Sequence, residues 1–165
     1  EAAGKRVERS PNVGRMSAGP SNPPASAVVP TAGTSAASQA LFHQKVLESD
    51  DAIKSGDFRR AIQAHTEAIA LDPCNHILYT NRSAAYAKIQ QYNKSLLDAR
   101  KARELNPKWA KAYIREGCAL QQLGQHADAL AAFALGLAQD ASNSSRLAGL
   151  MDSAIKSPLK DKLEP

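Results

Sequence analysis

The stretch ALDPCNHILY, residues 70–79, returns 34 residues later as ELNPKWAKAY, residues 104–113. Leucine, proline and tyrosine recur at the same offsets, and asparagine replaces aspartate before the proline. Two steps of 34 align Gly56 with Gly124, and Gln90 stands at the position between them. A fixed period of this length indicates stacked repeats, because each small unit can bury its apolar face only against its neighbours.

Each unit is predicted to hold two helices joined by a short turn. From residue 41 onward apolar residues recur at helical spacing, glycine is rare, and proline falls mostly at unit boundaries. We expect Asp72 and Asn106 to cap the helices that follow them, with the next proline at the first helical position. The predicted helices span residues 41–54, 58–71, 75–88, 92–105, 109–122, 126–138 and 143–156.

The two ends of the chain are predicted to lie outside this folded domain of residues 41–157. Residues 1–40 hold five prolines, four glycines and six serines without any helical or alternating apolar pattern. We expect them to be disordered, because they cannot bury enough apolar surface to offset their ordering entropy. Residues 158–165 are expected to link the domain to a downstream region of a longer protein.

The composition argues against several classes of function. The net charge of +5 is spread along the chain, unlike the dense basic stripe of a nucleic-acid binder. The most apolar run, residues 129–138, is about half of the ~20 residues that a membrane span requires. Cys74 and Cys118 lie in no paired motif, which favours a reduced, cytoplasmic protein. The histidines lack ligand spacing and no phosphate loop is present, so we expect no metal, cofactor or enzymatic activity.

The 34-residue period, with glycine and alanine at these offsets and proline closing the unit, resembles the tetratricopeptide repeat family. The resemblance implies an all-α, right-handed α-solenoid of three helix-turn-helix repeats, at about residues 42–75, 76–109 and 110–143, with a capping helix near 143–156. Residues 42–165 further resemble the first repeats of a very large animal member of this family, which is regarded as a cell-division scaffold.

In this family the first helices of the units line a concave groove that binds peptides. The groove residues that the resemblance implies are Asp50, Lys54, Asn81, Lys88, Lys111, Ile114, Arg115 and Cys118. The cations in this set outnumber its one acid, so the groove is expected to be basic. Lys111 and Arg115 stand four residues apart, where like charges repel on a helix, and an acidic ligand would relieve that repulsion. An ordinary solvated face is the alternative.

Some members of the family clamp the C-terminal carboxylates of heat-shock chaperones between two groups of side chains. Asn81, Lys111 and Arg115 match three positions of this clamp, whereas Val46 and Asp50 stand where a lysine and an asparagine are usual. Valine removes a charge-assisted donor, and aspartate repels a carboxylate. The clamp is therefore only half present.

Three hypotheses for the function remain open at the level of sequence. The first is a non-catalytic adaptor module whose basic groove binds an acidic or extended peptide of a protein partner. The second is a structural N-terminal segment of a large scaffold acting in cell division, with a cytoskeletal or spindle location. The third is co-chaperone-like binding of heat-shock protein C-terminal tails. None of them involves nucleic acid or a membrane.

Overall fold

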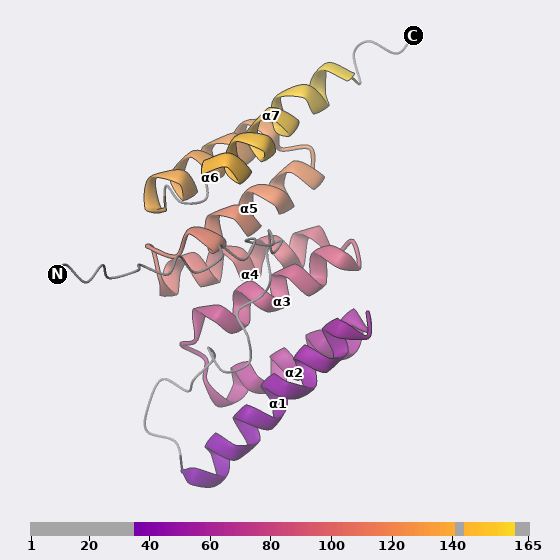
Figure 1. Cartoon of the computed structure of the whole chain (residues 1–165), viewed down its shortest axis with the longest axis vertical. Helices are drawn as coiled ribbons and strands as arrows, with labels where there is room; N and C mark the ends of the chain where they lie inside the picture. Colours follow the sequence, from indigo (N-terminus) through magenta and orange to yellow (C-terminus); the bar gives the residue numbers. More distant parts are fainter. Residues whose placement is uncertain (1–34, 141–143, 161–165) are drawn as a thin grey trace, which may run out of the picture.

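Seven α-helices make up the regular structure of residues 35–140 and 144–160, the parts of the chain that the computed structural model describes (Figure 1). They are α1 (Ala36–Lys54), α2 (Phe58–Leu71), α3 (His76–Lys88), α4 (Tyr92–Leu105), α5 (Ala110–Gln122), α6 (His126–Gln139) and α7 (Ser144–Lys160). α1 packs on α2, α3 on α4 and α5 on α6, while α7 covers α6. The predicted all-α stack of three helix pairs with a last covering helix is confirmed, and the bounds of α2 to α6 lie within one residue of the prediction.

The two end helices are longer than predicted. α1 begins at Ala36 rather than at residue 41, because the Ser35 side chain caps it by accepting a hydrogen bond from the Ser38 backbone N–H (3.3 Å), and the alanines that follow favour a helix. The prediction of disorder is therefore wrong for residues 36–40, and the rest of the predicted tail, apart from Ser35, lies outside the described residues. α7 continues to Lys160, so the predicted linker begins later than expected, and residues 161–165 are not described.

The turns between units differ from the predicted caps. Asp72 ends α2 instead of starting α3, and its backbone N–H donates to the Ala68 carbonyl at 3.0 Å. Asn75 caps α3, accepting from the Ile77 N–H at 3.3 Å while its side-chain amide donates to Asp72 Oδ2 at 3.1 Å. Asn106 likewise ends α4. The proline of each unit boundary therefore lies in a short turn between helices and not at a first helical position.

The recurring proline and tyrosine have a common structural role. The Tyr79 hydroxyl donates to the Pro73 carbonyl at 3.1 Å, and the Tyr113 hydroxyl donates to the Pro107 carbonyl at 2.8 Å. Each tyrosine thus fastens the first helix of a unit to the turn that precedes it. This repeated hydrogen bond explains why the two residues keep their offset along the sequence.

Small residues allow the paired helices to approach closely. A Cβ on Gly117 of α5 would clash with the ring of Phe133 on α6, which is fully buried. In the second unit Ser83 takes the place of that glycine, and its hydroxyl donates to the Ser95 carbonyl at 2.8 Å. In the first unit His65 stands at the register of Phe133 and is also fully buried.

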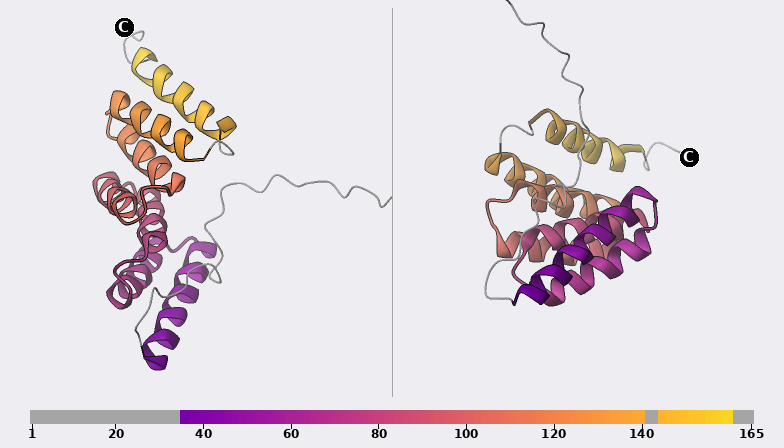
Figure 2. Two further views of the ribbon diagram at one scale, coloured as in Figure 1. Left: turned by 90° about the vertical axis from the view of Figure 1, so that its left-hand side faces the viewer. Right: turned by 60° about the horizontal axis from the view of Figure 1, so that its bottom comes forward.

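Contacts between units bend the stack. α3 contacts α5 and α5 contacts α7, whereas no comparable contact joins α2 to α4 or α4 to α6 among the described helices. α3, α5 and α7 therefore lie on the inside of the curve. Figure 2 shows α1 and α7 projecting to the same side at the two ends of the stack. We call the surface formed by α1, α3, α5 and α7 the inner face.

Candidate functional site

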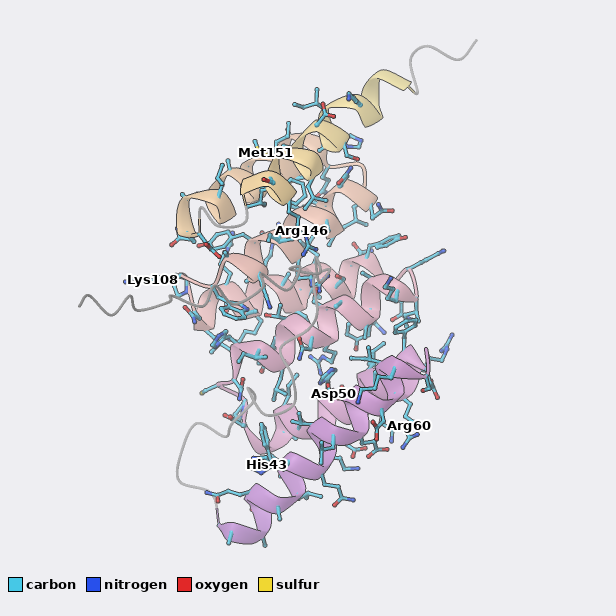
Figure 3. The ribbon with its side chains drawn as sticks, viewed as in Figure 1. His43, Asp50, Arg60, Lys108, Arg146 and Met151 are labelled. Atoms are coloured by element: carbon cyan, nitrogen blue, oxygen red, sulfur yellow. The ribbon has the colours of Figure 1, made fainter. Side chains whose placement is uncertain are left out.

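The inner face carries a cluster of cations where α5 meets α7. Lys111 and Arg115 lie one turn apart on α5, and both side chains are partly buried. Arg146 of α7 is partly buried as well, and Figure 3 shows it between α7 and the helices below. We call these three residues the cation cluster. Across the parts of the chain with described side chains, none of the three forms an ion pair with an acid.

The positive charges in the cluster disfavour one another. Burial lowers the pKa of the Lys111 ammonium, and the charges of Arg115 and Arg146 lower it further. Burial also lowers the pKa of the Arg115 guanidinium, again with a contribution from Arg146. The Lys111 ammonium lies 5.5 Å from the centre of the Trp109 ring, a cation–π contact that offsets part of this cost. An anion bound here would offset the cost of burying these charges and would reduce their mutual repulsion.

Asn81 brings α3 into the same site. It precedes Arg115 by one repeat of 34 residues, so the two occupy equivalent positions on successive inner helices. Asn81 is 2% exposed, and its Oδ1 atom has no hydrogen-bond partner within the described structure. Because buried polar atoms are nearly always paired in folded proteins, this one indicates a place where a bound group could donate a hydrogen bond.

The first helix contributes an acid instead of a second group of donors. Val46 is 2% exposed and packs against Phe42, Ala68 and Leu78, so its side chain belongs to the core of the first unit. Asp50 is partly buried on α1, and Figure 3 shows it at the opposite end of the inner face from Arg146. The α1 end of the inner face therefore presents an acid, and the α5–α7 end presents cations.

Two predicted groove lysines do not join the cation cluster. Lys54 and Lys88 are in the last turns of α1 and α3, and Lys54 pairs with Asp51 at 3.5 Å. Alternate helices of the stack run in the same direction, so these last turns lie far along the inner face from Lys111, in the first turn of α5. Lys54 and Lys88 therefore lie apart from the cation cluster.

Two further residues predicted to line the groove, Ile114 and Cys118, pack against other side chains. Ile114 is 3% exposed and belongs to the core of the third unit with Leu120 and Phe133, so its expected place in the groove is wrong. Its side chain is turned about 100° from that of Arg115, toward α6. Cys118 is partly buried, and burial raises the pKa of its thiol despite the nearby Arg115. A protonated thiol is a poor nucleophile, so Cys118 acts as a packing residue.

Sequence reasoning missed Arg146. It lies in the predicted covering helix, which the repeat period does not assign to the groove, and no counting rule from the preceding units places it there. The position of α7 on α5 and α6 brings it to the cation cluster. The described residues include no group of histidine, cysteine, aspartate or glutamate that could hold a metal ion, and no described helix has the length and apolar character of a membrane span.

Known proteins similar to this chain share its helical repeats. No family model matches it. In an alignment of 156 positions that covers 88% of this chain, the chain is 55% identical to human Tetratricopeptide repeat protein 28, of which it covers only 6%. The TPR2B domain of yeast Sti1, solved in complex with pHsp70, matches with a TM-score of 0.69 and 28% identity over 71% of this chain and 98% of that one. The second TPR domain of human RPAP3, in complex with the HSP70 peptide SGPTIEEVD, matches with a TM-score of 0.62 and 30% identity over 68% of this chain and 97% of that one.

Proposed function

Because the chain belongs to the tetratricopeptide repeat family, we propose that it is a non-catalytic protein-interaction module that binds an acidic peptide on its inner face. The observation that carries this proposal is the cation cluster. Three positive charges meet on partly buried positions without an acid to pair with in the described structure. Carboxylates of a bound peptide would supply the missing counter-charges.

The expected contacts follow from the chemistry of the residues. Arg115 can hold a carboxylate through two parallel N–H donors, while Lys111 presents a compact charge at the start of α5. The buried Oδ1 of Asn81 offers an acceptor for a backbone N–H of the same peptide. A peptide lying across α3 and α5 would meet all three groups.

The acidic peptide could also be the C-terminal tail of a heat-shock protein, but fewer observations support this ligand. The matched domains of Sti1 and RPAP3 are solved with Hsp70 sequences. In this chain Val46 is buried and Asp50 is acidic where the other half of a carboxylate clamp would lie. We expect a tail peptide to bind weakly, because the clamp lacks its second group of donors and Asp50 would repel a carboxylate.

A scaffold role is the second candidate, and the 55% identity to a protein of which this chain spans only 6% favours it. In that case the three-repeat domain would mainly stack on further repeats of a longer protein, with a structural role in cell division. For both candidate functions we propose a cytoplasmic location, because Cys74 and Cys118 are free thiols. A binding measurement separates the two candidates.

The experiment uses fluorescence anisotropy with a labelled hexaglutamate peptide and its hexaglutamine counterpart. We expect the wild-type protein to bind the acidic peptide only, and the double change Lys111→Ala and Arg115→Ala to weaken binding by about 2–4 kcal/mol. A charge-matched control changes Arg59 and Lys94, which are exposed on α2 and α4, to alanine. Equal binding by the two double variants, with unchanged circular dichroism, would show that the cation cluster is only a solvated face.

A further inference from the structure

Arg146 is placed beside α5 by the packing of its neighbour in the chain. Leu147 is fully buried in the core of the third unit, in one cluster with Ile114. Because the two residues are adjacent on α7, the anchoring of Leu147 fixes Arg146 at the junction of α5 and α7 (Figure 3). Arg146 is itself partly buried.

The junction gathers more positive charge than one carboxylate can neutralise. Lys111 and Arg146 lie in the first turns of α5 and α7, where the helix dipole adds partial positive charge to their own. Arg115 follows one turn later on α5. A single carboxylate would leave two of the three cations without a counter-charge. The other end of the inner face carries the acid Asp50, whereas this junction brings three cations together.

We propose that Arg146 completes a three-cation site for a doubly negative oxyanion, and that its ligand is a phosphorylated serine or threonine of the bound peptide. This inference rests on the proposed function, because it names the side chain that the inner face selects. A phosphoryl group carries a charge of about −1.5 to −2 at pH 7 and three acceptor oxygens. Each oxygen can accept from one of the three cations, and the two guanidinium groups offer the forked donors that suit phosphate.

The test compares three labelled peptides that differ at one position. They have the sequence GSGEXEGSG, in which X is phosphoserine, glutamate or serine. We expect the wild-type protein to bind the phosphoserine peptide roughly tenfold or more tightly than the glutamate peptide. Arg146→Gln should reduce that preference to about twofold, because the loss of one cation weakens binding of the doubly negative phosphoserine more than binding of the singly negative glutamate. Arg146→Lys should retain an intermediate preference, because it keeps the charge and loses the fork.

Controls separate the source of the anion and the role of the fold. Inorganic phosphate at millimolar concentration should compete poorly with the phosphoserine peptide, because it lacks the peptide contacts to α3. Competition as strong as that of the peptide would identify the ligand as a small anion and overturn the inference. Arg59→Gln removes an exposed charge from α2 and should alter neither affinity. Circular dichroism and the melting temperature verify that each variant is folded.

The remaining outcomes distinguish this inference from the function on which it rests. If the glutamate peptide binds through Lys111 and Arg115 but phosphoserine gives no advantage, the three-cation site is wrong and the proposed function stands. The three-cation site is equally wrong if the preference for phosphoserine survives Arg146→Gln. If neither the phosphoserine peptide nor the glutamate peptide binds the wild-type protein, the proposed function fails and the inference fails with it.

Discussion

Lowering the pH from 7 to 5 is expected to destabilise this domain through a single buried histidine. His65 lies in the core of the first unit with no exposed surface, and neither of its ring nitrogens has a hydrogen-bond partner within the described structure. Burial lowers the pKa of the His65 imidazole to about 4, with a smaller contribution from the charge of Arg82. The ring is therefore neutral in the folded protein at pH 7.

The sign and size of the effect follow from linkage. An unfolded histidine has a pKa of about 6.5, so the unfolded chain binds a proton before the folded one does, and protonation favours unfolding. The neutral ring contributes fully to the free energy of unfolding above pH 6.5. This contribution decreases as the pH falls and is fully lost below about pH 4. The full loss amounts to about 3 kcal/mol, of which about 2 kcal/mol is lost between pH 7 and pH 5.

Urea unfolding followed by circular dichroism at both pH values, at constant ionic strength, measures this loss. The control is His65→Phe, since Phe133 fills the equivalent position of the third unit. This variant should lose much less stability between pH 7 and pH 5. The acids Glu48 and Glu67 do not interfere, because hydrogen bonds from Lys45 lower their pKa values and their contributions are lost only at more acidic pH.

A second histidine, His76, adds to the pH dependence of stability. Burial also lowers the pKa of the His76 imidazole, whose Nε2 lies 3.2 Å from the side-chain amide of Asn106. A His76→Gln variant measures that part separately. Equal losses in the wild type and in His65→Phe would refute the argument, as would an NMR titration in which the ring of His65 protonates near pH 6.5 in the folded state.

Three further predictions concern stability and are read from the same denaturation curves. Gln90 has a φ of 61° at a turn where the other units have glycine, so Gln90→Gly should stabilise the protein by about 0.5–1 kcal/mol, and no gain would mean that the turn is not strained. Gly117→Ala should lower the free energy of unfolding by about 1–3 kcal/mol, because the added Cβ meets the ring of Phe133. Gly149→Ala on α7, where the added Cβ has open space, should raise it by up to about 1 kcal/mol. Similar effects at both sites would contradict the close packing of α5 and α6. Glu116→Gln should cost about 1–3 kcal/mol, since this 3% exposed carboxylate pairs with arginines of α4 at 2.9 and 3.1 Å, and a neutral effect would show that the pairs do not hold the second and third units together.

The repeat architecture was predictable because its determinants are local. Apolar spacing sets each helix, and the small residues at Gly117 and Ser83 mark where two helices approach. The period of 34 then repeats the same unit, so its helix bounds could be placed within one residue for α2 to α6. The start of α1 was missed because the composition of the tail outweighed a cap at Ser35 and a short run of alanines.

The candidate site was predictable only in part, because it depends on the faces that the helices present after packing. The spacing of Lys111 and Arg115 and their match to Asn81 in the preceding unit were visible in the sequence. The sequence did not show which neighbouring side chains point into the core, because one step along a helix rotates a side chain by about 100°. Both Val46 and Ile114 pack into the core. The tertiary structure alone decided that α7 folds back beside α5, anchored by a buried leucine, and so adds a third cation from outside the repeats.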